Sequence, residues 1–492
     1  MTPAHDAHAA EDTGRADIGQ TEEVADGQPD DAQSDAATGS PWWRSKRAAI
    51  VGGIVLALVA ALVATMLLLQ RTPEAPDPVA VTVPVALSNV TAPADLKLGV
   101  VVTMGQGQSQ GSEWAAAAEG AVVAQYRLAA GGSDVELVVE DDRGTPAGSL
   151  AAVESLLEEG VSGIVFATSG AHLAPGLEAA AAAKLPAVLP YAPLPEGSDL
   201  SDVYTLAPGA KDIEAGLNSA IAEFSYPVLL DAGSGVPGTV KVRETLRPEG
   251  GDLPAFAAEA ARRTGADATS HGAYTGTPDE EGAETEQPEA EEQPRADALV
   301  LSGHPRNLAL LVAQLQARNV SVPLILAPDA ASPAFAQALE VQGGSVSTSL
   351  ETVGVNLGDA VALGRDGQAR ALSAYLQSIR QLADDPDALN LLGDAPFAEV
   401  AGWADVRSHD AVLALATAAG EAGSTKPEQV AAQLSSLQLV AGDGVAGTSL
   451  DFTTPESASG KVQELVATGQ EFGLRPSSGI ALSWFTAPSD AP

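Results

Sequence analysis

The fold is decided by residues 135–175, which read VELVVEDDRGTPAGSLAAVESLLEEGVSGIVFATSGAHLAP. Residues 135–139 are an apolar, β-branched run and predict a strand. Residues 147–159 carry a helical pattern of Ala and Leu, and residues 163–167 form a second apolar run that ends in Thr168-Ser169-Gly170. A strand, a helix and a strand in this order predict two parallel strands joined by a crossover helix.

The same alternation continues on both sides of this unit. Short apolar runs bounded by Gly or Pro predict strands, and amphipathic patterns between them predict helices. The predicted strands are residues 96–103, 187–190, 227–231, 298–302 and 323–327, and the predicted helices include 112–130, 172–183 and 308–318. Buried parallel strands with helices between them indicate an α/β fold, in which helices cover both faces of the sheets.

Composition excludes several classes of protein. The chain has 492 residues, with 65 acidic against 25 basic side chains and a formal net charge of −40. That balance argues against binding to nucleic acid, because phosphate backbones are held by clustered Lys and Arg. The absence of cysteine excludes disulfides, thiolate catalysis and cysteine-bound metal sites. The sequence has no HExxH or P-loop motif, so we expect neither a cofactor, nor a metal, nor enzymatic activity.

The N-terminal part of the chain differs from the rest. Residues 1–41 contain ten acidic residues and a single arginine and lack an aliphatic cluster, so we expect them to be disordered. Residues 48–69 form an uncharged apolar stretch of 22 residues, preceded by a Trp pair and by Arg and Lys. A helix of that length spans about 33 Å, enough for a bilayer core of about 30 Å. We therefore predict an uncleaved transmembrane signal anchor over 42–71, with the N-terminus in the cytoplasm and the rest of the chain outside.

Two further segments are predicted to lie outside a folded core. Residues 72–94 are rich in Pro and Val, which predicts an extended tether. Residues 278–293 hold eight acidic residues and no basic one, which predicts a solvated acidic loop inserted into the globular region. The carboxylates of this insert lack the spacing of a calcium loop, so no metal role is predicted for it. The globular region is then expected to cover residues 95–492.

The order of the elements also carries a resemblance to a known family. It is carried by four stretches, residues 96–132, 135–175, 296–335 and 403–434. The second contains Asp141-Asp142 and the Ser169-Gly170 turn and is the most specific of the four. Together they resemble the type I periplasmic binding proteins of the branched-chain amino-acid (Leu/Ile/Val) class, the receptors of ABC importers. The resemblance implies two α/β lobes joined by three crossovers, with a ligand cleft between the lobes.

The resemblance also implies the extent of each lobe and the partners of the protein. It places the first lobe at about 95–208 and 354–447, and the second at about 209–353 and 448–492. The crossovers are expected near 207–209, 352–357 and 448–452. A small polar, amino-acid-like ligand and an ABC permease are the implied partners. Open parallel sheets bind ligands beyond the carboxyl ends of their strands, which places the site in the same cleft.

The candidate ligand site begins at Thr168-Ser169-Gly170, which follows a predicted strand and opens a predicted helix. A hydroxyl group and free backbone N–H groups at a helix N-terminus form a cradle for an anion such as a carboxylate. The same three residues also suit an ordinary helix cap, and the two roles are compatible.

Three more residues of the site come from the resemblance. It implies that Tyr191 and Ala192 supply a hydroxyl group and backbone contacts, and that Asp329 pairs with the ammonium group of the ligand. Asp329 is also compatible with a solvated turn or a helix cap. The sequence departs from the family at residues 105–110, which are rich in Gly and Gln, and at His304, where the family has an aromatic residue. The first-lobe half of the site therefore resembles the family more closely than the second-lobe half.

Two functions fit these observations. The first is an extracytoplasmic solute-binding protein that recognises an amino acid or a similar small polar ligand for an ABC importer. The second is a diverged binding fold that acts as an extracytoplasmic sensor or as an interaction and scaffold domain. The signal anchor with its cytoplasmic tail favours the second function, whereas the lack of a recognisable signalling domain in that tail favours the first.

Overall fold

The structure is a computed structural model of the chain. It describes residues 85–105, 109–195, 197, 200–233, 235–266, 294–347, 349–476 and 482–486. These belong to a compact unit that begins at Thr82. The predicted disordered tail, the signal anchor and the acidic insert fall outside the described residues, and so does the predicted tether before residue 85. Within the described part of the chain, no helix is both long and apolar enough to cross a membrane.

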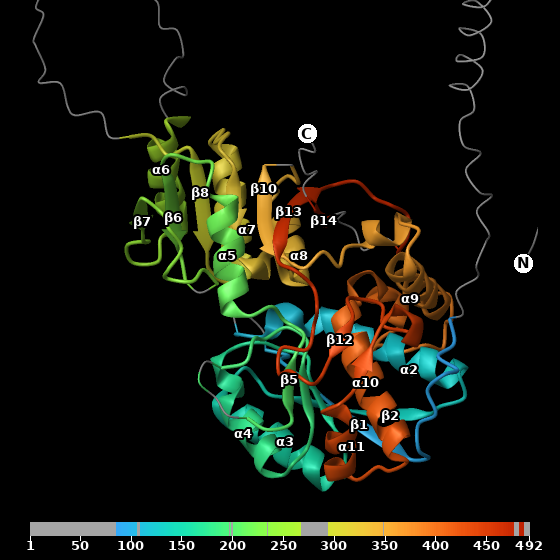
Figure 1. The fold of residues 1–492 in the computed structure, drawn as a ribbon. Coiled ribbons are helices and arrows are strands. Elements are labelled where there is room, and N and C mark those ends of the chain that lie inside the picture. The colour runs from blue at the N-terminus through green and yellow to red at the C-terminus, as the bar shows by residue number, and fades with distance from the viewer. Residues whose placement is uncertain are drawn as a thin grey trace, which may run out of the picture. The chain divides into compact units, whose positions relative to one another are not determined.

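The first lobe is built on a five-stranded sheet whose strands all run parallel (Figure 1). The sheet order is β2-β1-β3-β4-β5, with bounds Leu96–Val102 (β1), Val135–Asp141 (β2), Ile164–Phe166 (β3), Ala187–Leu189 (β4) and Val203–Thr205 (β5). Its helices are η1 (Ser112–Glu119), α2 (Gly120–Ala130), α3 (Pro146–Glu158), η2 (Ala171–Leu173) and α4 (Ala174–Ala182). All residues of β3, β4 and β5 are buried, as expected for a parallel sheet covered on both faces.

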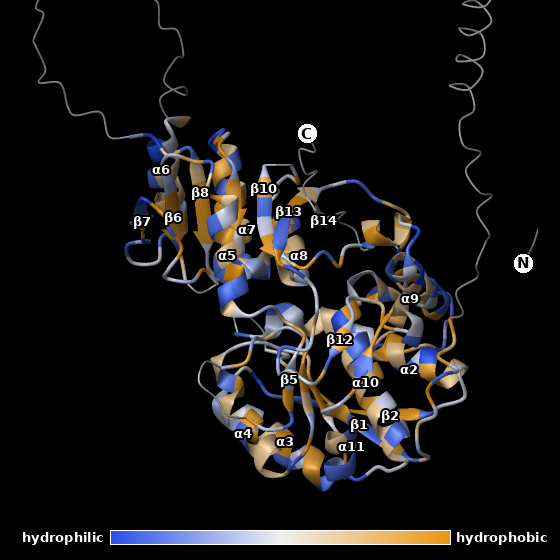
Figure 2. Cartoon of the chain, in the orientation of Figure 1, coloured by the Kyte–Doolittle hydropathy of each residue, from blue (hydrophilic) through white to orange (hydrophobic). Residues whose placement is uncertain are grey.

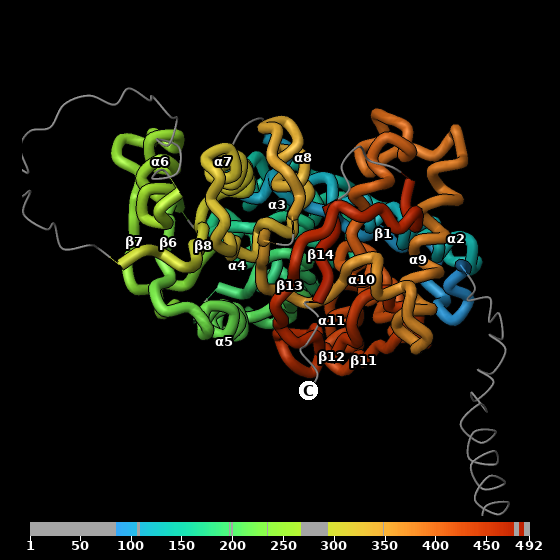
Figure 3. Tube along the Cα trace, turned by 90° about the horizontal axis from the view of Figure 1, so that it is seen from above, coloured from blue at the N-terminus to red at the C-terminus, as the bar shows by residue number. Residues whose placement is uncertain are grey.

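The second lobe is built on a seven-stranded sheet of order β14-β13-β10-β9-β8-β6-β7. The parallel strands are β6 (Pro227–Asp231), β7 (Glu244–Leu246), β8 (Ala298–Ser302), β9 (Leu324–Leu326) and β10 (Leu350–Gly354). The C-terminal strands β13 (Gln463–Thr468) and β14 (Ser483–Thr486) are antiparallel and extend the sheet beside β10 (Figure 1). The view from above shows β13 and β14 next to each other (Figure 3). The helices are α5 (Ala210–Ala220), α6 (Leu253–Thr264), α7 (Pro305–Ala317), η4 (Pro328–Ala331) and α8 (Pro333–Val341).

The apolar pattern of the sequence explains these layers. Strands β6 and β8 carry hydrophobic colour along their length, whereas helix α5 shows hydrophilic residues on its outer side (Figure 2). The buried residues of α5 are Ile213, Leu217 and Ala220, a spacing of about one helical turn that points one stripe at the sheet. Each lobe thus has its own core, and the predicted α/β architecture with two lobes is confirmed.

Three later helices return to the first lobe. They are α9 (Gly367–Ala383), α10 (Val406–Ala422) and α11 (Pro427–Leu434). Short elements lie around them, namely η5 (Asp359–Leu363), η6 (Phe397–Glu399), η7 (Ala401–Trp403), η8 (Ala441–Asp443), β11 (Gln438–Leu439) and β12 (Leu450–Asp451). Helix α10 packs against α2 and is buried along most of its length. Asp405 caps its N-terminus by accepting a hydrogen bond from the backbone N–H of Arg407 at 2.8 Å.

The chain passes between the two sheets three times. The first passage follows β5, the second follows β10 and the third precedes β13. The third comes later than the predicted 448–452, because β12 still pairs with β11 and Glu456 still pairs with Thr205 of the first lobe. A second correction concerns the predicted helix 112–130, which is a 3-10 helix as far as Glu119 and an α-helix after it.

Residues 85–94 correct the prediction of a tether through residue 94. Leu87 is 2% exposed and Val90 is 4% exposed, and both belong to the core of the first lobe. The backbone N–H of Leu87 donates to the carbonyl of Arg127 at 3.0 Å, and Arg127 Nε donates to the carbonyl of Val85 at 2.9 Å. The hydroxyl of Ser133 donates to the carbonyl of Val90 at 2.8 Å. The folded unit therefore includes residues 85–94.

Arg127 is the buried centre of this attachment. Its side chain is 1% exposed, and burial lowers its pKa to about 10. Arg127 Nη1 lies 2.9 Å from Nε2 of His409, whose Nδ1 lies 2.8 Å from Oδ1 of Asp410. Because an arginine side chain can only donate hydrogen bonds, Nε2 of His409 is the acceptor. Nδ1 of His409 therefore carries the ring proton and donates a hydrogen bond to Asp410. The pKa of His409 is lowered, chiefly by burial, which agrees with a neutral ring in this position.

We predict that Leu87→Ala destabilises the protein by about 2–5 kcal/mol, because it removes a fully buried side chain from a packed core. The matched control is Leu363→Ala, since Leu363 is 61% exposed and its truncation leaves no cavity. Chemical denaturation followed by circular dichroism measures both. Equal stability of Leu87→Ala and the control would mean that residues 85–94 do not belong to the folded unit.

Candidate functional site

A cavity of about 850 Å³ lies between the two lobes at the carboxyl ends of the parallel strands. Its wall takes residues from the loops after β1, β3, β4 and β5 in the first lobe, and from the loops after β8, β9 and β10 in the second. The loop after β6, the strands β13 and β14, the segment before α10 and residues 471–476 also contribute to the wall. This is the edge at which open α/β sheets bind ligands.

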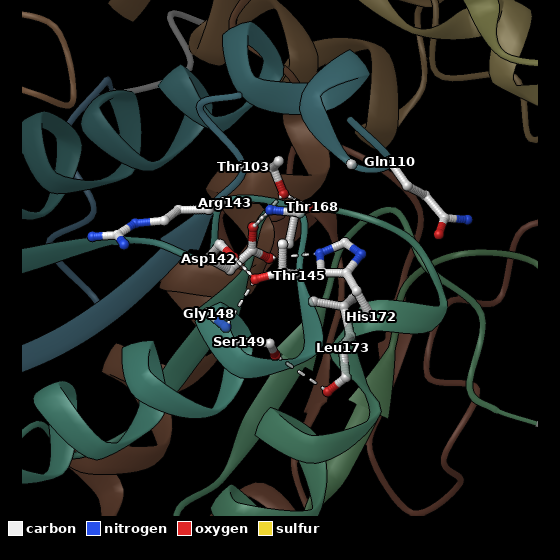
Figure 4. Close-up of polar contacts among 12 residues, drawn as sticks. Thr103, Gln110, Asp142, Arg143, Thr145, Gly148, Ser149, Thr168, His172 and Leu173 are labelled. Atoms are coloured by element: carbon white, nitrogen blue, oxygen red, sulfur yellow. Dashed lines mark hydrogen bonds and ion pairs between the residues drawn. The ribbon is translucent and has the colours of Figure 1, made fainter. Parts of the chain in front are cut away.

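Below the cavity floor, a buried carboxylate joins the ends of three neighbouring strands (Figure 4). Asp142, which follows β2, is 0% exposed. Its Oδ1 accepts hydrogen bonds from Oγ1 of Thr103 at 2.6 Å and from the backbone N–H of Gly144 at 2.8 Å. Its Oδ2 lies 2.8 Å from Nε2 of His172, a buried residue of η2. The hydroxyl of Thr103 has one proton and donates it in the hydrogen bond to Asp142. Thr168 is therefore the donor in the 2.6 Å contact between the two threonine hydroxyls.

The loop after β1 rests directly on the threonine pair. Gly111 has φ of 98°, and a Cβ at this position would lie 2.7 Å from Oγ1 of Thr103 and closer still to Oγ1 of Thr168. Only glycine combines this left-handed backbone with so close an approach. The backbone N–H of Gly111 therefore reaches the strand ends, where it becomes part of the cradle.

A carboxylate of the chain itself occupies a cradle formed by Ser169, a residue of the predicted site, and by Gly111, a donor outside the predicted residues. Glu113, in η1, is 4% exposed. Its Oε1 accepts a hydrogen bond from the hydroxyl of Ser169 at 2.5 Å, and its Oε2 accepts one from the backbone N–H of Gly111 at 2.8 Å. A third donor near this position, the backbone N–H of Ala171, binds the side-chain oxygen of Gln110 at 3.3 Å. The anion site proposed from the sequence is thus satisfied from within the chain.

Beside Glu113, two aromatic rings form part of the first-lobe wall. Trp114 and Tyr191 are stacked, with ring centroids 4.5 Å apart and planes 3° from parallel. The hydroxyl of Tyr191 lies 3.1 Å from the carbonyl of Ala117 and 2.5 Å from the hydroxyl of Ser408, so it points into the first lobe. Burial raises the pKa of Tyr191 well above its ordinary value. The ring of Tyr191 therefore lines the cavity, while its hydroxyl group is engaged by Ala117 and Ser408 inside the first lobe.

Arg407 brings a fixed positive charge to the same wall. Its guanidinium carbon lies 4.8 Å from the ring centroid of Trp114 and 4.6 Å from that of Tyr191, within the range of cation–π attraction. Its Nε and Nη2 donate to the two carboxylate oxygens of Asp405 at 3.0 and 3.2 Å. Burial alone would lower the pKa of Arg407, but the charge of Asp405 and its hydrogen bond outweigh burial and raise it. The guanidinium is thus permanently charged and already paired.

The second lobe contributes His304 and Asp329. Nδ1 of His304 accepts the backbone N–H of Arg306 at 3.3 Å and caps α7, so the neutral ring carries its proton on Nε2. That Nε2 lies 3.6 Å from Oε2 of Glu113 and forms a contact between the lobes. Asp329 follows β9, and its carboxylate has no hydrogen-bond donor among the described residues. Burial, and secondarily the charge of Glu113, raise the pKa of Asp329 to about 6 against the opposing effects of His304 and Arg407.

The structure brings most of the predicted site residues to one cavity. Ser169, Gly170, Tyr191, Ala192 and Asp329 line its wall. Thr168 is fully buried beneath it and bonds Thr103 instead. Sequence reasoning missed Glu113, Trp114 and Arg407 as parts of the site. Glu113 and Trp114 start a helix after the loop that follows β1, which is the signal that could have indicated them, whereas Arg407 lies at the start of α10, away from any strand end.

These observations define the class of fold, a two-lobe α/β protein of the periplasmic-binding-protein type, with parallel sheets flanked by helices. Comparison with solved structures gives the same class. The leucine-binding protein LivK of Thermotoga maritima superposes with a TM-score of 0.53 and 16% identity over 80% of this chain and 100% of that one. LivJ of Streptococcus pneumoniae, a branched-chain amino-acid transporter protein solved with isoleucine, gives 0.53 and 16% over 79% and 99%.

A third relative in structure binds a different ligand. It is a solute-binding protein of an ABC transporter from Rhodopseudomonas palustris, solved with 3,4-dihydroxybenzoic acid, with a TM-score of 0.52 and 14% identity over 80% of this chain and 95% of that one. At such identities the likeness shows the fold alone. No protein-family model matches the sequence. No curated protein matches it either.

We predict that Gly111→Ala disrupts the cradle, whereas Gly132→Ala is tolerated much better. Both glycines have positive φ, 98° and 92°, so both substitutions carry the same backbone strain. A Cβ at Gly132 meets no atom within 4 Å, whereas at Gly111 it meets the threonine pair, so any difference reports packing at the strand ends. Thermal unfolding measures the two variants, and the expected fall in melting temperature is several degrees larger for Gly111→Ala. Equal falls would contradict the close approach of this loop to Thr103 and Thr168.

Proposed function

We propose that this chain is an extracytoplasmic solute-binding protein whose cavity between the lobes holds a small ligand with an ammonium group. The observation that carries the proposal is the carboxylate of Asp329, which faces the cavity from the second lobe without a donor among the described residues. A carboxylate that is partly withdrawn from water and has no donor is unfavourable, and a ligand cation supplies the missing charge and hydrogen bonds. The ligands named for the structurally similar proteins, leucine-class amino acids and an aromatic acid, support a small organic solute.

Ligand contacts are proposed from both lobes. Ser169 and Gly170 lie at the cradle, Tyr191 and Ala192 follow β4, and Asp329 lies opposite them. Thr168 supports Ser169 from below through its bond to Thr103. A ligand that touches both walls favours the arrangement in which the lobes are close, because contacts with both are made only there. This coupling of binding to lobe closure is what a receptor uses to report occupancy to a partner.

A transport role follows from the same fold. An ABC permease is the proposed partner, and we propose that residues 42–71 anchor the chain so that the tail lies in the cytoplasm and the two lobes outside. The alternative is an extracytoplasmic sensor or scaffold domain that retains the fold without transport. One observation favours this alternative, namely that Glu113 already occupies the cradle in which an amino-acid carboxylate would otherwise bind.

Binding rather than catalysis is the proposed activity. Asp142 and His172 form a buried carboxylate–imidazole pair, the arrangement that activates a nucleophile in hydrolases. In the described part of the chain, however, Nδ1 of His172 has no hydrogen-bond partner, and the hydroxyl of the nearby Ser149 is directed to the carbonyl of Leu173 at 3.4 Å. The pair is better explained as the support of three strand ends.

The proposal is tested by a thermal-shift screen of the full chain, purified in detergent, against amines, amino acids and related small solutes. Ligand at a hundred times its dissociation constant stabilises a protein by about 2.7 kcal/mol. For any solute that binds, Asp329→Asn is expected to weaken affinity by about 10- to 150-fold, the value of a charge-assisted hydrogen bond of about 1.5–3 kcal/mol. A library without a single stabilising solute would contradict the solute-binding function.

The pH dependence gives a second check on Asp329. Only the ionised carboxylate attracts an ammonium group, and its pKa is about 6, so affinity should rise as pH increases through 6 and level off above it. Binding should release a proton near that pH, which calorimetry in buffers of different ionisation enthalpy measures. Asp329→Asn should remove the dependence. The imidazole of His304 also faces Asp329 and Glu113, so His304→Gln measures its contribution to the pH dependence of affinity. A flat profile in the wild type would rule out Asp329 as the cation partner.

Membrane topology is tested on intact cells of an expressing host. External protease should digest the part of the chain after residue 71 and spare a tag fused at the N-terminus, because residues 48–69 are uncharged and the Arg and Lys residues precede them. Immunoblots against the two ends read the result. Protection of the C-terminal lobes would contradict the proposed orientation.

A further inference from the structure

Glu113 has the hydrogen bonds that a bound carboxylate would have. Its two oxygens accept from the hydroxyl of Ser169 and from the backbone N–H of Gly111, at 2.5 and 2.8 Å. Glu113 is 4% exposed and lies in the first turn of η1, so its backbone is fixed within the first lobe. A second carboxylate cannot enter the same cradle, because both donors are used and two carboxylates at this distance repel each other.

The charges on the cavity wall are unequal once the paired groups are set aside. Arg407 is bound by Asp405, and Arg475 is bound by Asp359, whose oxygens accept its Nε at 3.0 and 2.7 Å. Glu113, Asp329 and Glu471 then remain on the wall, against the imidazole of His304. The wall therefore carries an excess of negative charge and favours a cation over an anion or a zwitterion.

The second-lobe wall has a polar side chain next to Asp329 that no described residue satisfies. Ser332 is 2% exposed and is the N-cap residue of α8, yet among the described residues its Oγ has no hydrogen-bond partner and makes no capping bond. Asp329 lies three residues earlier, and both residues line the cavity. An ammonium group has three N–H donors, which a carboxylate and a hydroxyl oxygen can accept together. The orphaned hydroxyl is an observation independent of the charge count, and it points to a ligand donor at this place.

The remaining wall is apolar and wide. Its residues away from the polar groups include Ile213, Val236, Val353, Trp403, Phe472 and Trp484. A volume of about 850 Å³ leaves room for a hydrocarbon or aromatic body behind the ammonium group.

We propose that the cavity takes a primary amine with an apolar body and no free carboxylate beside the ammonium group, and that Glu113 determines this choice by filling the carboxylate cradle. The inference rests on the proposed solute-binding function and narrows its ligand class. An α-amino acid is rejected because its carboxylate meets Glu113, whereas the corresponding decarboxylated amine keeps its contact with Asp329 and Ser332 and loses nothing.

The first experiment compares matched pairs on the full chain by thermal shift and calorimetry. The probes are L-phenylalanine against phenethylamine and L-leucine against 3-methylbutylamine. The amine of each pair is expected to bind about tenfold or more tightly than its amino acid, the difference that one charge-assisted contact makes. Equal or tighter binding of the amino acids overturns the inference and leaves the solute-binding function standing. Stabilisation by solutes that are not amines, with no effect of either amine, overturns the inference and the ammonium group proposed for the ligand, and leaves the solute-binding function standing.

The second experiment opens the cradle. In Glu113→Ala the hydroxyl of Ser169 and the N–H of Gly111 lose their acceptor, so formate or acetate should raise the melting temperature of this variant and not of the wild type. L-phenylalanine should now bind, since its carboxylate takes the vacated position. Glu113→Gln is the matched control, because it keeps the side-chain volume and fills the cradle without a charge, so formate should have no effect on it.

Glu113→Gln also keeps the inference testable if Glu113→Ala does not fold. The neutral variant should lose affinity for phenethylamine by about tenfold, because one of the two carboxylates that attract the cation is gone. Unchanged amine affinity in Glu113→Gln, or a folded Glu113→Ala that neither formate nor L-phenylalanine stabilises, overturns the assignment of Glu113. The response of Glu113→Ala to formate does not depend on which solute the wild-type protein binds, so this reading is distinct from the test of the proposed function.

Discussion

The buried carboxylate of Asp142 is the constraint on which the ligand cavity depends. It accepts hydrogen bonds from Thr103 and Gly144 and lies against the imidazole of His172, at distances of 2.6 to 2.8 Å. A carboxylate with 0% exposure is tolerated only when donors surround it. Thr103 follows β1, Gly144 follows β2, and His172 lies in η2, which follows β3. The hydrogen bonds to this one carboxylate therefore fix the relative positions of the three strand ends. The loops that form the first-lobe wall start from those ends.

The contact between Glu113 and His304 connects this rigid base to the second lobe. Glu113 is fixed by two hydrogen bonds within the first lobe, whereas His304 is fixed by its capping bond at the start of α7. Their facing atoms are 3.6 Å apart, longer than a hydrogen bond, so the contact does not lock the lobes together. The two halves of the site can then separate and meet again without breaking the bonds that hold either half.

Much of this arrangement could be predicted from local sequence. The apolar runs at 227–231 and 298–302 became β6 and β8 with the predicted bounds, since buried parallel strands need continuous apolar residues. Ser169 and Asp329 could be placed at one cavity because each follows a strand of a parallel sheet. Glu113 could not, because its partner Ser169 is far along the chain and a 3-10 turn, rather than the predicted α-helix, directs it. The folded part of 85–94 was missed for a similar reason, as its burial depends on Arg127.

The attachment of residues 85–94 has a mechanical consequence. Their hydrogen bonds run to Arg127, Ser133 and Asp443, all within the first lobe. A force applied to the chain before residue 85 is therefore transmitted to the first lobe alone. The second lobe is connected to the first through the three crossovers, so tension in the preceding chain reaches the second lobe only through the first.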